Sequence, residues 1–227
     1  MFIGIVFMIF AVTIFFIIKS TGKFQKKTAM TFQELAHEFK GKYHEAGPRF
    51  GRIAALFQGR KALHDFSKKY RGGYYPALSF PVKGGEGIVL FQTTGTEETL
   101  EYWTDIVITL DKPFGKNISV CREGYIDKFT KLLGAQDIQV GDSEFNRRFI
   151  IKSDDEIFAL NKLDIAARKI INRISMLTRG YSEVRVGSNI FIRINGFLDE
   201  KGKIREYLIL AMDLCRHFIR SIDEANL

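Results

Sequence analysis

Residues 77–93 have the sequence ALSFPVKGGEGIVLFQT, in which two apolar runs flank a glycine-rich segment. Short runs rich in β-branched and aromatic side chains are typical of strands, and glycines between two such runs are typical of a hairpin. We therefore expect strands over residues 77–82 and 88–93, joined by a turn at residues 84–87. This pair predicts an antiparallel sheet.

Further strand patterns follow along the chain. Residues 100–110 are rich in aromatic and β-branched side chains, and a turn at residues 111–115 leads into a strand at 118–121. Residues 145–152 also have a strand pattern. Residues 184–186 and 190–194 alternate around Gly187-Ser188-Asn189, which predicts a second hairpin.

Helical patterns occur on both sides of these strands. Residues 31–34 and 153–156 match the capping box, in which Ser or Thr at the N-cap is followed three residues later by Glu. They predict a helix from Thr31 to about Gly41 and a long helix over residues 154–178. An amphipathic helix is expected from Lys203 to the C-terminal region and a short helix over 125–133, and residues 52–70 favour a helix weakly because glycines interrupt the pattern. Runs of antiparallel strands combined with helices predict an α+β fold and not a doubly wound sheet.

Residues 2–18, FIGIVFMIFAVTIFFII, contain no charge, and a basic cluster follows at once. A helix of this length rises about 25 Å, close to the ~30 Å hydrocarbon core of a bilayer, and lysine side chains can extend to the headgroups. We therefore expect an N-terminal transmembrane helix, a membrane anchor over residues 1–19. The side chains expected to contact lipid are Phe2, Ile5, Phe7, Ile9, Phe10, Phe15, Phe16 and Ile18.

A cleaved secretory signal is the alternative interpretation of this segment. Such signals carry positive charge before the apolar run and small residues at a cleavage site after it. Here the basic cluster follows the run, and Ser20-Thr21-Gly22 is a poor cleavage site. Because basic residues beside a membrane segment stay on the cytoplasmic side, we expect a single-pass protein of the inner (cytoplasmic) membrane with a cytoplasmic body. Long domains can translocate despite this bias, so the opposite orientation stays open.

The domain organisation follows from this anchor. A basic juxtamembrane linker is expected over residues 20–30 and a soluble α+β domain over residues 31–227, with a possible internal boundary near 135–144. The formal net charge is +8, but residues 19–83 contain 14 Lys and Arg against 4 Asp and Glu. The membrane-proximal third is therefore strongly basic, and the rest of the chain is slightly acidic.

This charge asymmetry suits an anionic lipid surface, where each nearby Lys or Arg contributes on the order of 1 kcal/mol. The residues expected to contact lipid headgroups or another anionic partner are Lys19, Lys23, Lys26, Lys27, Lys68, Lys69 and Arg71. An ordinary solvated basic face is an equally simple interpretation. Nucleic acid would be attracted by the same charges, but a single Arg-Gly-Gly among tyrosines makes it an unfavoured partner.

No pattern in the chain predicts catalysis, a metal or a cofactor. Glu34-x-x-His37 has the spacing of a di-iron half-site but lacks a second copy. Residues 196–203 have five residues between the glycines of a phosphate loop, which needs four. The acids at 154–156 fit the start of a helix. An enzyme whose site is assembled from scattered residues around Arg147 and Arg148 stays an alternative.

Two segments resemble those of uncharacterised bacterial membrane-anchored proteins with a domain of unknown function. Residues 35–43, LAHEFKGKY, are similar to their early helix ending in Gly and an aromatic residue. Residues 145–155, FNRRFIIKSDD, look like their strand-to-helix signature, which often has Asp where Asn146 stands. The resemblance covers about residues 31–198 and implies a membrane-tethered α+β domain in a bacterium, without catalytic residues. The favoured hypothesis is thus a non-enzymatic interaction or scaffold domain with an unidentified protein partner.

Overall fold

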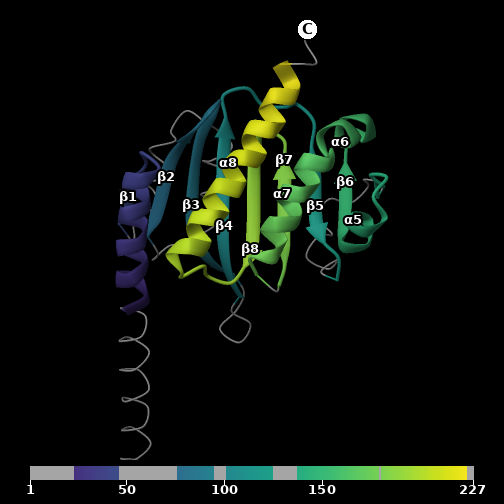
Figure 1. Cartoon of the computed structure of the whole chain (residues 1–227). Helices are drawn as coiled ribbons and strands as arrows, with labels where there is room; N and C mark the ends of the chain where they lie inside the picture. The colour runs from purple at the N-terminus through teal and green to yellow at the C-terminus, as the bar shows by residue number, and fades with distance from the viewer. Residues whose placement is uncertain (1–22, 46–75, 95–100, 125–136, 179, 224–227) are drawn as a thin grey trace, which may run out of the picture.

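An antiparallel sheet of eight strands forms the centre of the protein in the computed structural model (Figure 1). The structure describes residues 23–45, 76–94, 101–124, 137–178 and 180–223. The strands are β1 (Lys42–His44), β2 (Ala77–Val82), β3 (Gly85–Thr94), β4 (Glu101–Leu110), β5 (Ile118–Arg122), β6 (Phe149–Ser153), β7 (Ser182–Val186) and β8 (Asn189–Asn195). Their order across the sheet is β1-β2-β3-β4-β8-β7-β5-β6.

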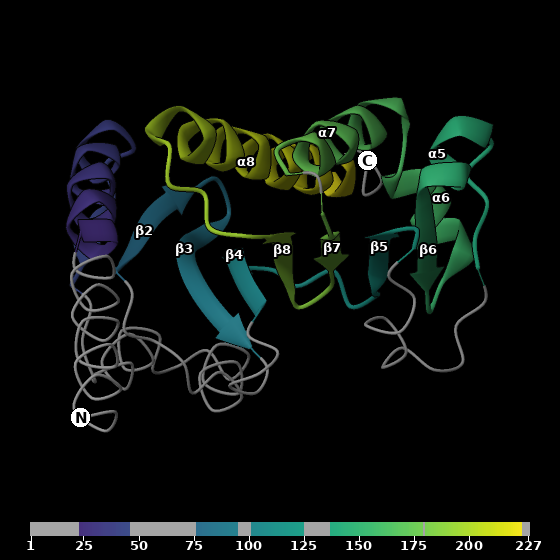
Figure 2. The same cartoon turned by 90° about the horizontal axis from the view of Figure 1, so that it is seen from below.

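Helices accompany this sheet. In the described residues they are helix 23–38, α5 (Ser143–Arg148), α6 (Glu156–Lys162), α7 (Ile165–Met176) and α8 (Lys201–Asp223). Figure 2 shows α7 and α8 lying over one face of the sheet, with helix 23–38 beside the β1–β2 edge. The α+β class and the antiparallel sheet predicted from the sequence are confirmed. Both predicted hairpins are also present, as β2–β3 and β7–β8.

The two faces of the sheet carry different side chains, because successive residues of a strand point to opposite sides. On β4, Ile106 and Ile108 belong to the main core, which also contains the buried residues of α7 and α8. Asp105 and Val107 alternate with them and therefore point to the other side, which we call the second face. Val107 joins a separate apolar cluster there with Phe191 of β8.

The β2–β3 hairpin is tighter than the sequence suggested. Val82 pairs with Gly85, so the turn consists of Lys83 and Gly84, and the remaining glycines belong to β3. Gly84 has a φ of 76°, a conformation that glycine adopts without steric cost. Gly87 lies directly beneath the ring of Phe80, where an added Cβ would collide with the aromatic carbons.

Helix 23–38 corrects the first capping-box prediction. The helix was expected to begin at Thr31, after a linker, but residues 23–30 are already helical. Thr31 is a buried mid-helix residue. The helix ends in a Schellman motif, in which the Gly41 amide donates to the Ala36 carbonyl and the Lys40 amide to the His37 carbonyl. Lys40, and not the neighbouring glycine, occupies the left-handed position with a φ of 52°.

The long helix predicted over residues 154–178 is in fact two helices. α6 ends at Lys162, and Asp164 caps a new helix, α7, by accepting a hydrogen bond from the Ala167 amide. The apolar spacing continues through the break, since Ala159, Leu163 and Ala167 are all buried. The first N-cap is Asp155 and not Ser153, because the Asp155 carboxylate accepts from the Phe158 amide.

The strand predicted over residues 145–152 begins later than expected. Residues 143–148 form the short helix α5, capped by Asp142, and only Phe149–Ser153 form β6. Phe145 and Phe149 therefore pack ring against ring, 4.6 Å apart, across a change from helix to strand.

Several predictions concern residues outside the described part of the chain. The apolar segment 2–18, the ambiguous segment 52–70 and the short helix 125–133 fall there. Within the described residues, no helix combines the length and the apolar character needed to cross a membrane.

Candidate functional site

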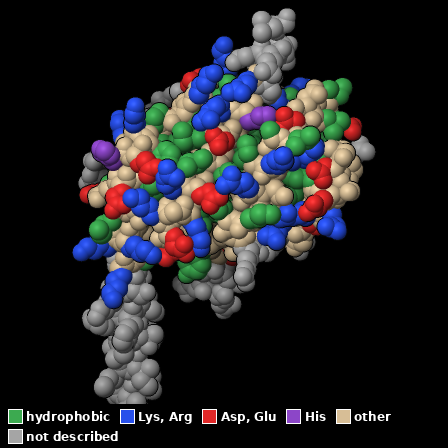
Figure 3. All heavy atoms as spheres, in the orientation of Figure 1, with side chains coloured by type: hydrophobic (Ala, Val, Ile, Leu, Met, Phe, Trp, Pro, Cys, Tyr) green, Lys and Arg blue, Asp and Glu red, His purple; other side chains and the backbone are tan. Residues whose placement is uncertain are grey.

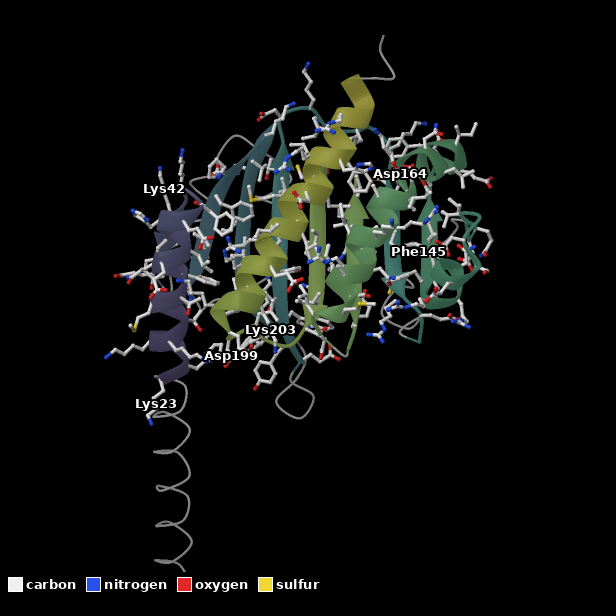
Figure 4. All side chains as sticks on the ribbon, viewed as in Figure 1. Lys23, Lys42, Phe145, Asp164, Asp199 and Lys203 are labelled. Carbon is white, nitrogen blue, oxygen red and sulfur yellow. The ribbon has the colours of Figure 1, made fainter. Side chains whose placement is uncertain are left out.

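The lysines expected to contact an anionic partner are divided between the described and the other residues. Lys19, Lys68, Lys69 and Arg71, like the eight anchor side chains, lie outside the described residues. Lys23, Lys26 and Lys27 are exposed in the first turns of helix 23–38. Figure 4 shows Lys23 at the N-terminal end of the described part of this helix. The structure thus brings three of the seven predicted residues together.

Helix 23–38 is an integral part of the body and not a tether beside it. Phe32 and Leu35 are completely buried in the main core, and the Phe32 ring lies 5.4 Å from that of Phe91 on β3. Buried apolar side chains of this size each contribute about 1.5–3 kcal/mol relative to exposure. The position of the lysines is therefore fixed relative to the sheet.

Three ion pairs join the exposed side of helix 23–38 to α8 and the turn before it. They are Lys27–Asp199, Glu34–Lys201 and Glu38–Arg205. Residue numbers rise together in these pairs, so the two helices run parallel. Lys27 is therefore already paired, at 3.0 Å, whereas neither Lys23 nor Lys26 forms an ion pair with another described residue.

An aromatic chain links the first turn of helix 23–38 to the sheet. The Phe24 ring stacks on Phe197, 5.3 Å away, and Phe197 contacts Tyr102 at 5.0 Å and Phe91 at 4.9 Å. Phe197 lies in the turn between β8 and α8, while Tyr102 is the second residue of β4. Tyr102 keeps 43% of its surface exposed.

The first turn of helix 23–38, Phe197 and Tyr102 lie at one end of the sheet, which we call the lysine end. Trp103 pairs with Asn195, so β4 begins where β8 finishes, and Gln92 near the end of β3 pairs with Trp103. α8 starts from the same place, and its ion pairs hold the first turns of helix 23–38 beside it. Figure 4 shows Lys23, Asp199 and Lys203 at this end and Asp164 at the other.

The charges on the rest of the helix-covered face are mixed. Figure 3 shows basic and acidic side chains interspersed over α7 and α8. Ion pairs there are local or join neighbouring helices, for example Arg216–Asp213 at 3.0 Å and Arg173–Glu206 at 2.9 Å. A continuous basic face of the kind that follows a nucleic-acid backbone is therefore not visible on this side of the described chain.

The second face of the sheet carries a charged network that sequence reasoning missed. Asp105 on β4 is fully buried and opposes Arg193 on β8, which donates from both Nε and Nη2 to the two carboxylate oxygens. Arg193 also donates to Gln92 Oε1 at 3.4 Å, and its guanidinium lies 5.0 Å from the Trp103 ring. Burial raises the pKa of the Asp105 carboxyl, and the Arg193 guanidinium opposes this shift.

A second pair continues the network along the same face. Glu183 on β7 pairs in register with Arg193 and binds Arg185 at 2.7 Å. The two guanidinium groups share one ring, since Arg185 lies 4.5 Å and Arg193 5.1 Å from the centroid of Phe191. Two acids thus balance two arginines, which gives a rigid neutral network and leaves none of these four charges as a free catalytic group.

Both cysteines are buried and unpaired with each other. Cys121 on β5 is completely inaccessible, and Cys215 on α8 is 1% exposed. Burial raises the pKa of Cys121 to about 12 and that of Cys215 to about 11. Thiols in this state are poor nucleophiles, because the reactive species is the thiolate.

Lys162 is a buried cation in the described part of the chain. It is 5% exposed, donates to the Phe218 carbonyl at 3.1 Å and lies over the rings of Phe114 and Phe158. Burial lowers the pKa of its amine. The lysine thereby joins the end of α6 to α8, next to the contact between His217 and Asp164 at 3.0 Å.

The residues considered for an enzyme do not converge. Arg147 and Arg148 lie in the last turn of α5, where the helix dipole stabilises cations. They do not lie on an open strand, as the sequence pattern predicted. Arg148 stacks on Phe149 at 5.7 Å. Among the described residues, no three His, Cys, Asp or Glu side chains are placed to hold a metal ion.

Asn146 of α5 has a structural contact. Its Oδ1 accepts the Val140 amide at 3.1 Å, a hydrogen bond that a carboxylate could also accept. The contact holds the segment before α5 against the helix.

A search with the whole chain found no matching protein-family model, curated protein or solved structure.

Proposed function

We propose that this protein is a membrane-tethered, non-enzymatic interaction domain of the inner membrane. Residues 2–18 form the tether as a transmembrane helix, and the lysine end contacts anionic headgroups. The observation that carries the proposal is the position of Lys23 and Lys26. They are exposed, unpaired with other described residues, and fixed to the core five to eight residues after the apolar run.

The charge pattern supports a cytoplasmic body, since the basic residues that follow the apolar run belong on that side. It also favours lipid over nucleic acid, because the exposed lysines that follow the apolar run, Lys23, Lys26 and Lys27, all lie in the first turns of one helix. The rest of the helix-covered face has both signs of charge (Figure 3). The body then acts as a rigid platform for a protein partner on its remaining surface.

The tether is tested by alkaline carbonate extraction of membranes that contain the full chain. The wild type is expected in the pellet. Replacing two residues of the apolar run by lysine, Ile9→Lys with Phe10→Lys, is expected to release it, since each lysine at the centre of a membrane helix costs about 2.5–3.5 kcal/mol. The variant Ile9→Leu with Phe10→Leu is the matched control. Wild-type protein in the supernatant would refute the tether.

The headgroup contact is tested separately by vesicle flotation of residues 20–227, after its cooperative unfolding has been verified. Replacing Lys23 and Lys26 by Gln is expected to weaken binding to anionic vesicles about 30-fold, at about 1 kcal/mol per lysine. The double Arg variant keeps the charge and should bind as the wild type does. Equal binding of the Gln variant and the wild type would refute the contact.

A further inference from the structure

Tyr102 is an exposed aromatic side chain at the lysine end of the sheet, where the described chain begins at Lys23. A single ring, Phe197, separates it from Phe24 and contacts both. Phe24 is the second residue of the described helix. The exposed tyrosine is thus two aromatic contacts away from the point where the chain enters the body.

The chain between the apolar run and this point is short. Five residue steps join Ile18 to Lys23, so even a fully extended chain spans no more than about 18 Å. Helix 23–38 is held in place against the body, because Phe32 and Leu35 are buried and three ion pairs join the helix to α8 or its preceding turn. Whatever layer holds Lys23 therefore also lies close to Tyr102.

We infer that Tyr102 contacts the lipid headgroup layer, so that the lysine end of the sheet rests on the bilayer and the strands stand away from it. This inference rests on the proposed tether and adds an orientation to it. Tyrosine suits such a position because its ring is apolar and its hydroxyl is polar, and tyrosines are enriched at membrane–water interfaces. Phe197 supports the ring from behind in an edge-on contact at 74°.

The opposite end of the sheet provides a control position. Lys112 is exposed just after the end of β4, and Tyr102 lies at its start. At the usual rise per residue of a strand, the two side chains are about 30 Å apart. Both native cysteines are buried, so an added surface cysteine can be labelled selectively. Trp103, the only tryptophan in the sequence and a buried one, reports through its emission whether each variant is folded.

The experiment uses the full chain reconstituted in anionic vesicles. Tyr102→Cys and Lys112→Cys are each labelled with the fluorophore NBD, and the vesicles contain a lipid with a nitroxide on its headgroup. We expect at least threefold greater fractional quenching at position 102 than at position 112. Equal quenching at the two positions, or greater quenching at position 112, overturns the orientation.

Carbonate extraction of the same vesicles distinguishes this failure from failure of the tether. A carbonate-resistant protein with equal quenching at both positions keeps the tether and loses the contact of Tyr102. A protein that carbonate extracts, and that is quenched at neither position, loses both.

Discussion

Replacing Asp105 by Asn should destabilise the protein more than any other single loss of a carboxylate considered above. Asp105 is fully buried and binds Arg193 through two hydrogen bonds. The amide is nearly isosteric but neutral, so it leaves the Arg193 guanidinium, whose side chain is 12% exposed, without its counter-charge.

The magnitude follows from this burial. Removing one partner of a buried ion pair costs about 3–5 kcal/mol, because the remaining charge stays desolvated. Arg193 keeps some stabilisation from the rings of Trp103 and Phe191, so the lower part of that range is expected. For a body of about 200 residues, 3 kcal/mol corresponds to a fall in Tm of roughly 6–12 °C.

Urea denaturation followed by Trp103 fluorescence measures this difference. Asp199→Asn is the matched control, because Asp199 forms an exposed pair with Lys27 and its loss should cost no more than about 1 kcal/mol. A loss of stability in Asp105→Asn that is no larger than in Asp199→Asn would refute the argument that the network is desolvated and structural.

Four further predictions concern groups in the core and at helix ends. The pKa values of Cys121 and Cys215 are raised in the folded protein, so on raising the pH these thiols ionise first in the unfolded chain. The free energy of unfolding should therefore hold up to about pH 8.5 and then fall by up to about 1.4 kcal/mol per pH unit per thiol. Replacing both cysteines by Ala should flatten this pH dependence. Tyr207→Phe should cost about 1 kcal/mol, because the hydroxyl donates to backbone carbonyls of the sheet, at 2.9 Å in the nearer case. Lys40→Gly should stabilise the protein by about 1 kcal/mol by relieving the positive φ. Asp164→Ala should cost about 1 kcal/mol through loss of the α7 N-cap, and all four are measured by urea denaturation.

Each of these expectations has an opposing result. An alkaline slope that survives in the double Ala variant would assign it to other groups, such as the buried tyrosines. A stability gain in Lys40→Ala equal to that in Lys40→Gly would remove the argument from φ. An unchanged midpoint in Tyr207→Phe or Asp164→Ala would show that water replaces the lost hydrogen bond.

The sheet was more predictable than the helices. The β2–β3 and β7–β8 hairpins follow from glycines and alternating apolar residues that lie within a few positions of one another. The break at Leu163–Asp164 was missed because the apolar spacing continues through it, so that only the cap at Asp164 marks a new helix. α5 was missed because Phe149 and the residues after it form a strand and obscure the cap at Asp142.

The charged network could not be predicted because its partners are distant in the sequence. Asp105 and Arg193 come together only after β4 pairs with β8, and a charged residue in a strand normally indicates a solvated face. The position of the lysines was easier to predict, because charge density along the chain is visible directly. Their attachment to the core was not, since the segment before Thr31 has the composition of a linker and forms a packed helix instead.

The parallel packing of helix 23–38 with α8 has a mechanical consequence. α8 extends over 23 residues, or about 34 Å, from the lysine end towards the opposite end. Tension applied between Lys23 and the far end of α8 would pull the two helices past each other along their axes. The buried aromatic contacts and the three ion pairs would then be loaded at the same time. The protein should therefore resist this shearing force better than a force that separates the helices from one end and breaks the contacts one after another.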